Sequence, residues 1–165
     1  MLFLLDASVL ITANNTYYPI ERVPEFWEWL AHQATLGLIK LPLEIFEEVL
    51  PGRKNDDPLP GWIMDHRDVL LLAEAADPAL VQRVVNEGYA PDLTDDELEE
   101  IGRDPFLIAY GMAGPDRCVV TSEPSSPKKQ RKNRRIPDVC NTFGIACYDP
   151  FYVYKTLGFR TAWKR

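Results

Sequence analysis

Short apolar segments alternate with helical segments along this 165-residue chain, and this alternation restricts the folds that it can adopt. Four segments are short and largely apolar, as is typical of strands buried on both faces: residues 2–5, 38–41, 118–121 and 145–149. Between them, stretches such as 24–36 and 62–76 have the composition of helices, and Thr94 and Glu97 have the spacing of a capping box. Strands that alternate with helices predict an α/β fold, a three-layer α/β/α sandwich around a central, mostly parallel sheet.

The composition fits one globular domain spanning residues 1–165. Hydrophobic residues make up 46% of the chain and charged residues 26%, and the length allows a sizeable core. The three cysteines, Cys118, Cys140 and Cys147, are odd in number and widely spaced, which argues against a disulfide framework or a zinc site. We expect Cys140 and Cys147 to be small core residues.

The apolar N-terminal segment lacks the features of a signal peptide. Asp6 interrupts it, and it has neither a basic region nor a small-residue cleavage site. No apolar run approaches the roughly 18 residues that a membrane-spanning helix needs. We therefore expect a soluble, cytoplasmic protein with no membrane partner.

Four acidic residues adjoin apolar segments: Asp6, Glu48, Asp104 and Glu123. Asp6 and Glu123 follow predicted strands, and ligands of parallel sheets bind at the carboxyl ends of the strands. Carboxylates drawn together at a core repel one another and lose hydration, and a bound divalent cation compensates. Oxygen ligands suit Mg²⁺ or Mn²⁺, so the pattern indicates metal-assisted phosphodiester chemistry.

Each acid also has a purely structural interpretation. Asp6 and Asp104 could cap the helices that follow them, and Glu123 could be an ordinary loop residue. Glu48 has an acidic neighbour, Glu47, and either could lie on a solvated helix face. We choose Glu48 because Ile45 and Val49 mark the predicted buried face, and Glu48 lies three residues after Ile45 on the same side of the helix.

A basic segment, residues 128–135, stands out from an otherwise acidic chain whose net charge is −7. It contains six basic residues and no acid: Lys128, Lys129, Arg131, Lys132, Arg134 and Arg135. A local cluster of this kind can hold a phosphate backbone, so these side chains are candidates for contacts with a nucleic acid. The alternative is a solvated loop.

Four motifs together resemble those of PIN-domain ribonucleases: LLDASVLI, IFEEVL, DPFLIAYG and VVTSE. They occur in the same order and cover essentially the whole chain. More narrowly, YYPIERVPEFWEWL, IPDVC and FYVYKTLGF resemble a PIN subgroup described only as a domain of unknown function. Members of that subgroup are similar to the toxins of bacterial and archaeal toxin–antitoxin pairs.

The resemblance implies a metal-dependent endoribonuclease, a toxin held in check by an antitoxin protein. Its catalytic, metal-binding acids would be Asp6, Glu48, Asp104 and Glu123, with one or two Mg²⁺ or Mn²⁺ ions. Ser8 matches the polar residue after the first Asp and would support a carboxylate or metal-bound water, although it could instead cap a helix. The fourth motif usually ends in Asp, and here it has Glu123. The resemblance also implies RNA and a second copy of the chain as partners, with the basic residues of 128–135 contacting the RNA near the acids. The alternative is a catalytically silent PIN-like module that binds RNA or protein.

Overall fold

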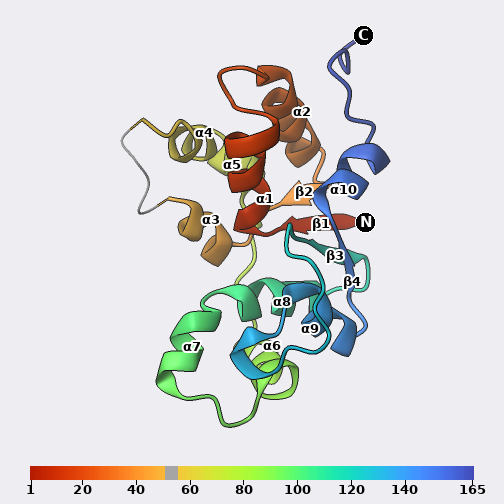
Figure 1. Ribbon diagram of the computed structural model, residues 1–165. Helices are drawn as coiled ribbons and strands as arrows, with labels where there is room; N and C mark the ends of the chain where they lie inside the picture. Colours follow the sequence, from red (N-terminus) through yellow and green to blue (C-terminus); the bar gives the residue numbers. More distant parts are fainter. Residues whose placement is uncertain (51–55) are drawn as a thin grey trace.

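A single parallel sheet lies at the centre of the protein, whose computed structural model describes residues 1–50 and 56–165 (Figure 1). Its strands are β1 (Leu2–Leu5), β2 (Ile39–Lys40), β3 (Arg117–Val120) and β4 (Ala146–Tyr148), in the spatial order β2-β1-β3-β4. All three pairings are parallel. The predicted α/β fold with a central parallel sheet is therefore confirmed.

Helices connect the strands and cover both faces of the sheet. The α-helices are α1 (Ala7–Thr12), α2 (Pro24–Thr35), α3 (Leu43–Val49), α4 (Leu59–Asp65), α5 (Arg67–Leu70), α6 (Pro78–Arg83), α7 (Asp95–Ile101), α8 (Asp104–Met112), α9 (Ile136–Thr142) and α10 (Pro150–Thr156). Shorter turns are the π-helical η1 (Ala13–Tyr17) and η2 (Val84–Tyr89) and the 3₁₀ turn η3 (Arg131–Asn133). In Figure 1, α6 to α9 lie below the sheet, whereas α1, α2 and α10 lie above it, which gives a three-layer sandwich.

The pairing of β1 with β3 brings two strand ends to the same level. Leu5 pairs with Val120, and the Asp6 amide donates a hydrogen bond to the Val120 carbonyl oxygen at 2.8 Å. The Thr121 amide donates in turn to the Tyr148 carbonyl oxygen at 3.1 Å. Residues that follow β1 and β3 therefore leave the sheet side by side at its carboxyl edge.

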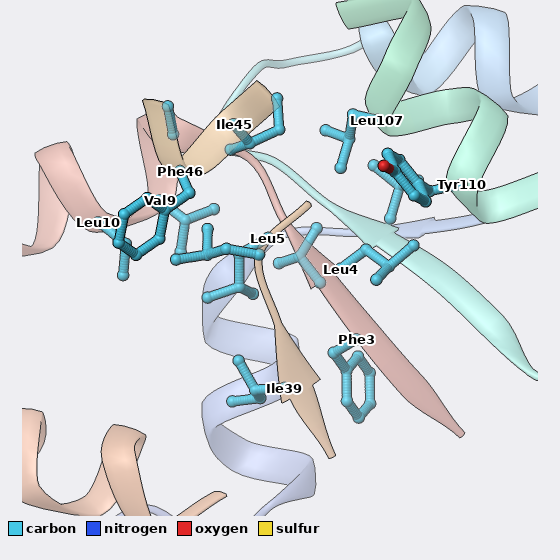
Figure 2. Close-up of a cluster of buried hydrophobic side chains, with 14 of the residues drawn as sticks. Phe3, Leu4, Leu5, Val9, Leu10, Ile39, Ile45, Phe46, Leu107 and Tyr110 are labelled. Carbon is cyan, nitrogen blue, oxygen red and sulfur yellow. The ribbon is translucent and has the colours of Figure 1, made fainter. Parts of the chain in front are cut away.

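Buried aliphatic side chains place α3 and α8 in one core with the central strand β1. Figure 2 shows Ile45 of α3 and Leu107 of α8 in the same buried cluster as Leu4 and Leu5 of β1. All four are fully buried. Because burying such a side chain stabilises the fold by roughly 1.5–3 kcal/mol, this core holds α8 against β1 and α3 against α8, near the end of β1 from which Asp6 emerges.

The aromatic residues of α2 belong to the core. Phe26, Trp27 and Trp29 are at most 1% exposed, and Phe26 stacks on Tyr18 with ring centroids 4.4 Å apart. The indole nitrogen of Trp27 donates to the Tyr18 carbonyl oxygen at 2.6 Å. These rings are therefore unavailable as a surface for a second copy or an antitoxin.

The segment predicted as one helix over 62–76 is divided in the structure, so that prediction is wrong. Helix α4 ends at Asp65, α5 ends at Leu70, and Leu71 then forms a parallel bridge with Leu41. Backbone pairing with a distant segment thus replaces helix continuation. Elsewhere, Cys118 and Cys140 are buried free thiols, and Cys147 is a half-buried one. Among the described residues, no helix is long and apolar enough to cross a membrane.

Candidate functional site

Asp6 lies at the carboxyl end of β1 and is only 6% exposed. Its Oδ2 accepts hydrogen bonds from Ser8 Oγ at 2.5 Å and from Thr121 Oγ1 at 2.9 Å. Although Asp6 precedes α1, its side chain makes no capping hydrogen bond, so the capping interpretation does not apply. Burial raises the pKa of Asp6 despite these two bonds, and the charge of Glu123 adds to the increase.

Two hydroxyl groups join the ends of β1 and β3. The Ser8 hydroxyl accepts from the Ser122 amide at 3.2 Å, and the Thr121 hydroxyl accepts from the Glu123 amide at 3.2 Å. Ser8 therefore orients Asp6 and does not cap the helix. Thr121, 2% exposed, was not among the predicted site residues. Its position at the end of a strand paired with β1 was the signal that could have identified it.

Asp104 is the first residue of α8 and is half-buried. The N-cap position of α8 is occupied by Arg103, so Asp104 is not the cap, and within residues 1–50 and 56–165 its side chain has no hydrogen-bond or ion-pair partner. Burial and the charges of Asp6, Glu123 and Glu48, in that order, raise the pKa of Asp104 to about 8. All three other predicted acids thus act on this one carboxyl group.

Glu47 and Glu48 of α3 have different surroundings. Glu47 Oε2 lies 2.7 Å from Arg103 Nη1, and the same nitrogen donates to the Glu44 carbonyl oxygen at 2.7 Å. Glu48 has no such ion pair among the described residues. Loss of hydration raises the pKa of the Glu48 carboxyl, the charge of Asp6 raises it further, and Arg103 partly offsets both. Both glutamates are exposed, and the interaction of Glu48 with the charge of Asp6 favours Glu48 over the paired Glu47 as the acid of the site.

Glu123 follows β3 and is half-buried. Its Oε2 accepts from the Ile136 amide at 3.0 Å, where α9 begins, and its Oε1 lies 3.5 Å from Arg135 Nη1. The longer glutamate arm thus reaches from the end of β3 to the start of α9. A cation bound at Glu123 would compete with Arg135 for the same carboxylate.

Most of the predicted RNA-binding segment is engaged with the protein itself. Arg131 lies 2.7 Å from Asp92 and 2.8 Å from Glu97, and Lys132 lies 2.6 Å from Glu100. Arg134 donates to the Gly88 carbonyl oxygen, and Arg135 contacts Glu123. In the described part of the chain, only Lys128 and Lys129 of the six are exposed without an ion pair.

Tyr89, which sequence reasoning missed, places an unpaired hydroxyl near the acids. The residue is 7% exposed, and its hydroxyl oxygen is buried without a hydrogen-bond partner in the described structure. Burial raises the pKa of Tyr89, and the charges of Asp104 and Glu123 raise it further. A buried hydroxyl without a partner is costly, so a polar species is expected to occupy this position in the working protein.

The oxygen atoms of these side chains are suitable ligands for a hard cation, but they do not converge tightly on one point. Among the described residues, no three His, Cys, Asp or Glu side chains are close enough together to hold a single ion. Four carboxylates and an unpaired hydroxyl nevertheless offer only oxygen, which suits Mg²⁺ or Mn²⁺, and Mg²⁺ usually keeps several of its waters. The arrangement therefore fits an ion held through one or two carboxylates and bridging waters.

A comparison with known protein families gives a match to a family of unknown function. A family model described as "Domain of unknown function (DUF4411)" matches residues 3–161. No curated protein and no solved structure matches the chain significantly.

Proposed function

We propose that this chain, which belongs to the DUF4411 family, is a metal-dependent endoribonuclease of the PIN type. The observation that carries the proposal is the group of carboxylates at the carboxyl edge of the parallel sheet. The charges of the other three acids all raise the pKa of one member, Asp104. Burying mutually repelling charges lowers stability, so such a group is retained where it binds a cation or a reacting centre.

Asp6, Glu48, Asp104 and Glu123 would hold one or two Mg²⁺ or Mn²⁺ ions, directly or through water. Such an ion supplies a lowered pKa for its water and charge stabilisation at the scissile phosphate. Ser8 and Thr121 fix the Asp6 carboxylate in one orientation. In the metal-free protein, the Asp104 carboxyl holds a proton near neutral pH, and it gives up that proton when a cation binds.

Arg135 provides a positive charge beside the acids. Its guanidinium lies 3.5 Å from Glu123 and is 37% exposed, so it can also reach a phosphate at the site. A guanidinium matches the geometry of a phosphate and offsets the negative charge that develops on its oxygens. We assign Arg135 this role rather than general RNA binding.

The test is cleavage of single-stranded RNA by the purified protein, with Mg²⁺ or Mn²⁺ and with EDTA. We expect metal-dependent cleavage, lowered on the order of a hundredfold or more in Asp6→Asn, which keeps the shape of the side chain but removes its charge. Exposed Asp116 provides the control, because Asp116→Asn removes a charge elsewhere and should leave cleavage unchanged. Metal-dependent binding without cleavage would instead support the silent binding module.

The toxin assignment rests on the resemblance to toxin-like PIN proteins. The Asp6→Asn variant tests it as well. Expression of the chain alone in the cytoplasm should slow bacterial growth, whereas Asp6→Asn should not. Co-expression of an antitoxin encoded beside the gene should restore growth. Equal growth with the active and inactive proteins would remove the toxin role while leaving the nuclease proposal intact.

A further inference from the structure

A pocket of about 370 Å³ opens beside the acidic group, which comprises Asp6, Glu48, Asp104 and Glu123. It lies between α1, η1, the end of β3 and the start of α10, and its wall includes Thr121, Ser122 and Glu123. Thr121 donates to Asp6 and Glu123 is one of the four acids, so the pocket and the acidic group share a wall. A group that occupies this pocket would therefore be attached to, or lie next to, whatever reacts at the acids.

Aromatic rings also line the pocket. Tyr17 of η1 and Phe151 of α10 are 51% and 46% exposed, and their ring centroids lie 4.9 Å apart at an angle of 86°. The ring of Tyr154 lies 5.8 Å from that of Phe151, and it too lines the pocket. Single exposed aromatics are common, but rings from distant parts of the chain that line one hollow form a surface for a flat apolar ring.

The charges at the pocket restrict its occupant further. Glu123 and Asp149 both line it, and no Lys or Arg of the described residues does. Asp149 uses one carboxylate oxygen to accept from the Tyr152 amide at 3.1 Å, which leaves the other as an acceptor for an amino group. An anionic ligand such as a phosphate is therefore disfavoured, whereas a neutral ring that carries N–H donors is complementary.

We propose that this pocket binds one unpaired nucleobase of the RNA strand, next to the phosphate that the acids cleave. This inference rests on the proposed nuclease function and adds the place where a base of the single-stranded RNA would bind. In a duplex, each base is stacked and paired, so it could enter the pocket only after leaving the helix, whereas a single strand offers its bases without that cost. Stacking on aromatic side chains tolerates all four bases, so the pocket selects strandedness more than sequence.

The test uses a short single-stranded RNA that carries one 2-aminopurine, whose fluorescence is quenched by stacking. It is titrated with Ca²⁺ in place of Mg²⁺, and RNA integrity is checked on a gel. We expect quenching by the wild-type protein, and loss of quenching with about tenfold weaker binding in Phe151→Ala. Phe151→Trp should restore both. Tyr152→Ala is the matched control, since Tyr152 is a 43% exposed aromatic on the same helix that does not line the pocket.

Two further titrations, with duplex RNA and with free adenosine, test whether the pocket requires a base in a single strand. The same strand annealed to its complement should bind more weakly and show no additional quenching, and free adenosine should bind far more weakly than the strand. Equal quenching by Phe151→Ala and the wild-type protein would overturn the proposal, as would equal affinity for the duplex. A changed oligomeric state of Phe151→Ala with unchanged RNA binding would assign the pocket to a second copy of the chain and would also overturn it.

Failure of this proposal is distinguishable from failure of the nuclease proposal. Phe151-dependent quenching without metal-dependent cleavage would retain the pocket and reject the enzyme. Metal-dependent cleavage with unaltered quenching in Phe151→Ala would retain the enzyme and reject the pocket.

Discussion

At the scale of single residues, Glu47 and Glu48 are exposed sequence neighbours that interact with different charged groups. Glu47 is paired with Arg103 at 2.7 Å, whereas the pKa of Glu48 is raised by desolvation and by the charge of Asp6. We expect Glu48→Gln to lower metal-dependent cleavage on the order of a hundredfold, because it removes a charge that faces the reacting centre. Glu47→Gln should leave cleavage near wild type and cost at most about 1 kcal/mol of stability, as exposed ion pairs do.

Parallel cleavage assays and denaturant titrations of the two variants check this prediction. The two variants each lose one negative charge, at adjacent positions, so each serves as the control for the other. The reverse ordering of activities would mean that the functional face of α3 is rotated by about 100° from the face that carries Glu48.

At the scale of elements, the contact between α7 and the basic segment changes what that segment can do. The pairing of Arg131 with Asp92 and Glu97 neutralises its charge, and Arg131 lowers the pKa of Glu97 to about 2. A cation that already has two carboxylate partners must give them up before it can bind a phosphate. RNA contacts are therefore expected at Lys128 and Lys129 rather than along the whole segment.

The double variant Lys128→Ala/Lys129→Ala tests this expectation. It should weaken binding to all single-stranded sequences alike, and lower the slope of log affinity against log salt by roughly 0.7 for each phosphate that the protein no longer neutralises. Lys155→Ala/Lys164→Ala removes the same charge elsewhere and provides the control. Arg131→Ala should leave the slope unchanged while loosening the packing of the segment on α7. A larger slope change in Arg131→Ala than in the Lys128/Lys129 variant would show that Arg131 exchanges its carboxylates for phosphate.

The elements also show which parts of the structure local sequence patterns could predict. The strand at residues 2–5 and the capping box of Thr94 and Glu97 depend on neighbouring residues, and both are confirmed. The division of the predicted 62–76 helix depends on the bridge between Leu41 and Leu71, which no local pattern encodes.

The site follows the same rule. Sequence pattern identified the strand-end and helix-borne acids, and register between β1 and β3 explains why Asp6 and Glu123 act on each other. Thr121 was missed because its partner Asp6 is distant in the sequence, and Tyr89 because only the fold brings its hydroxyl near Asp104 and Glu123. The pairing of Arg131 was missed for the same reason, since the composition of residues 128–135 cannot show that α7 lies beside them.

At the scale of the whole molecule, the acidic group couples stability to pH. The folded-state pKa of Asp104 is about 8, well above its ordinary value of 3.8, and the pKa values of Asp6 and Glu48 are also raised. Through these three acids the folded metal-free protein binds more protons than the unfolded chain between about pH 4 and pH 8, so its free energy of unfolding falls as pH rises through this range, and their contribution levels off above it. For Asp104 the loss should be on the order of 2 kcal/mol, less than the full linkage value because solvent reaches the half-buried carboxyl.

Denaturant titrations in EDTA across this pH range measure that slope. Asp104→Asn should flatten it and make the metal-free protein more stable at pH 8, whereas Asp116→Asn, which changes an exposed acid, should do neither. Mg²⁺ or Mn²⁺ at about one hundred times its dissociation constant should raise the wild-type free energy of unfolding by roughly 2.7 kcal/mol at pH 8, and much less in Asp104→Asn. A pH slope that persists unchanged in Asp104→Asn would place the destabilising charge elsewhere in the acidic group. Equal stabilisation of both proteins by the cation would place its binding site away from Asp104, and the same carboxylates could then no longer account for both the pH dependence and the metal dependence.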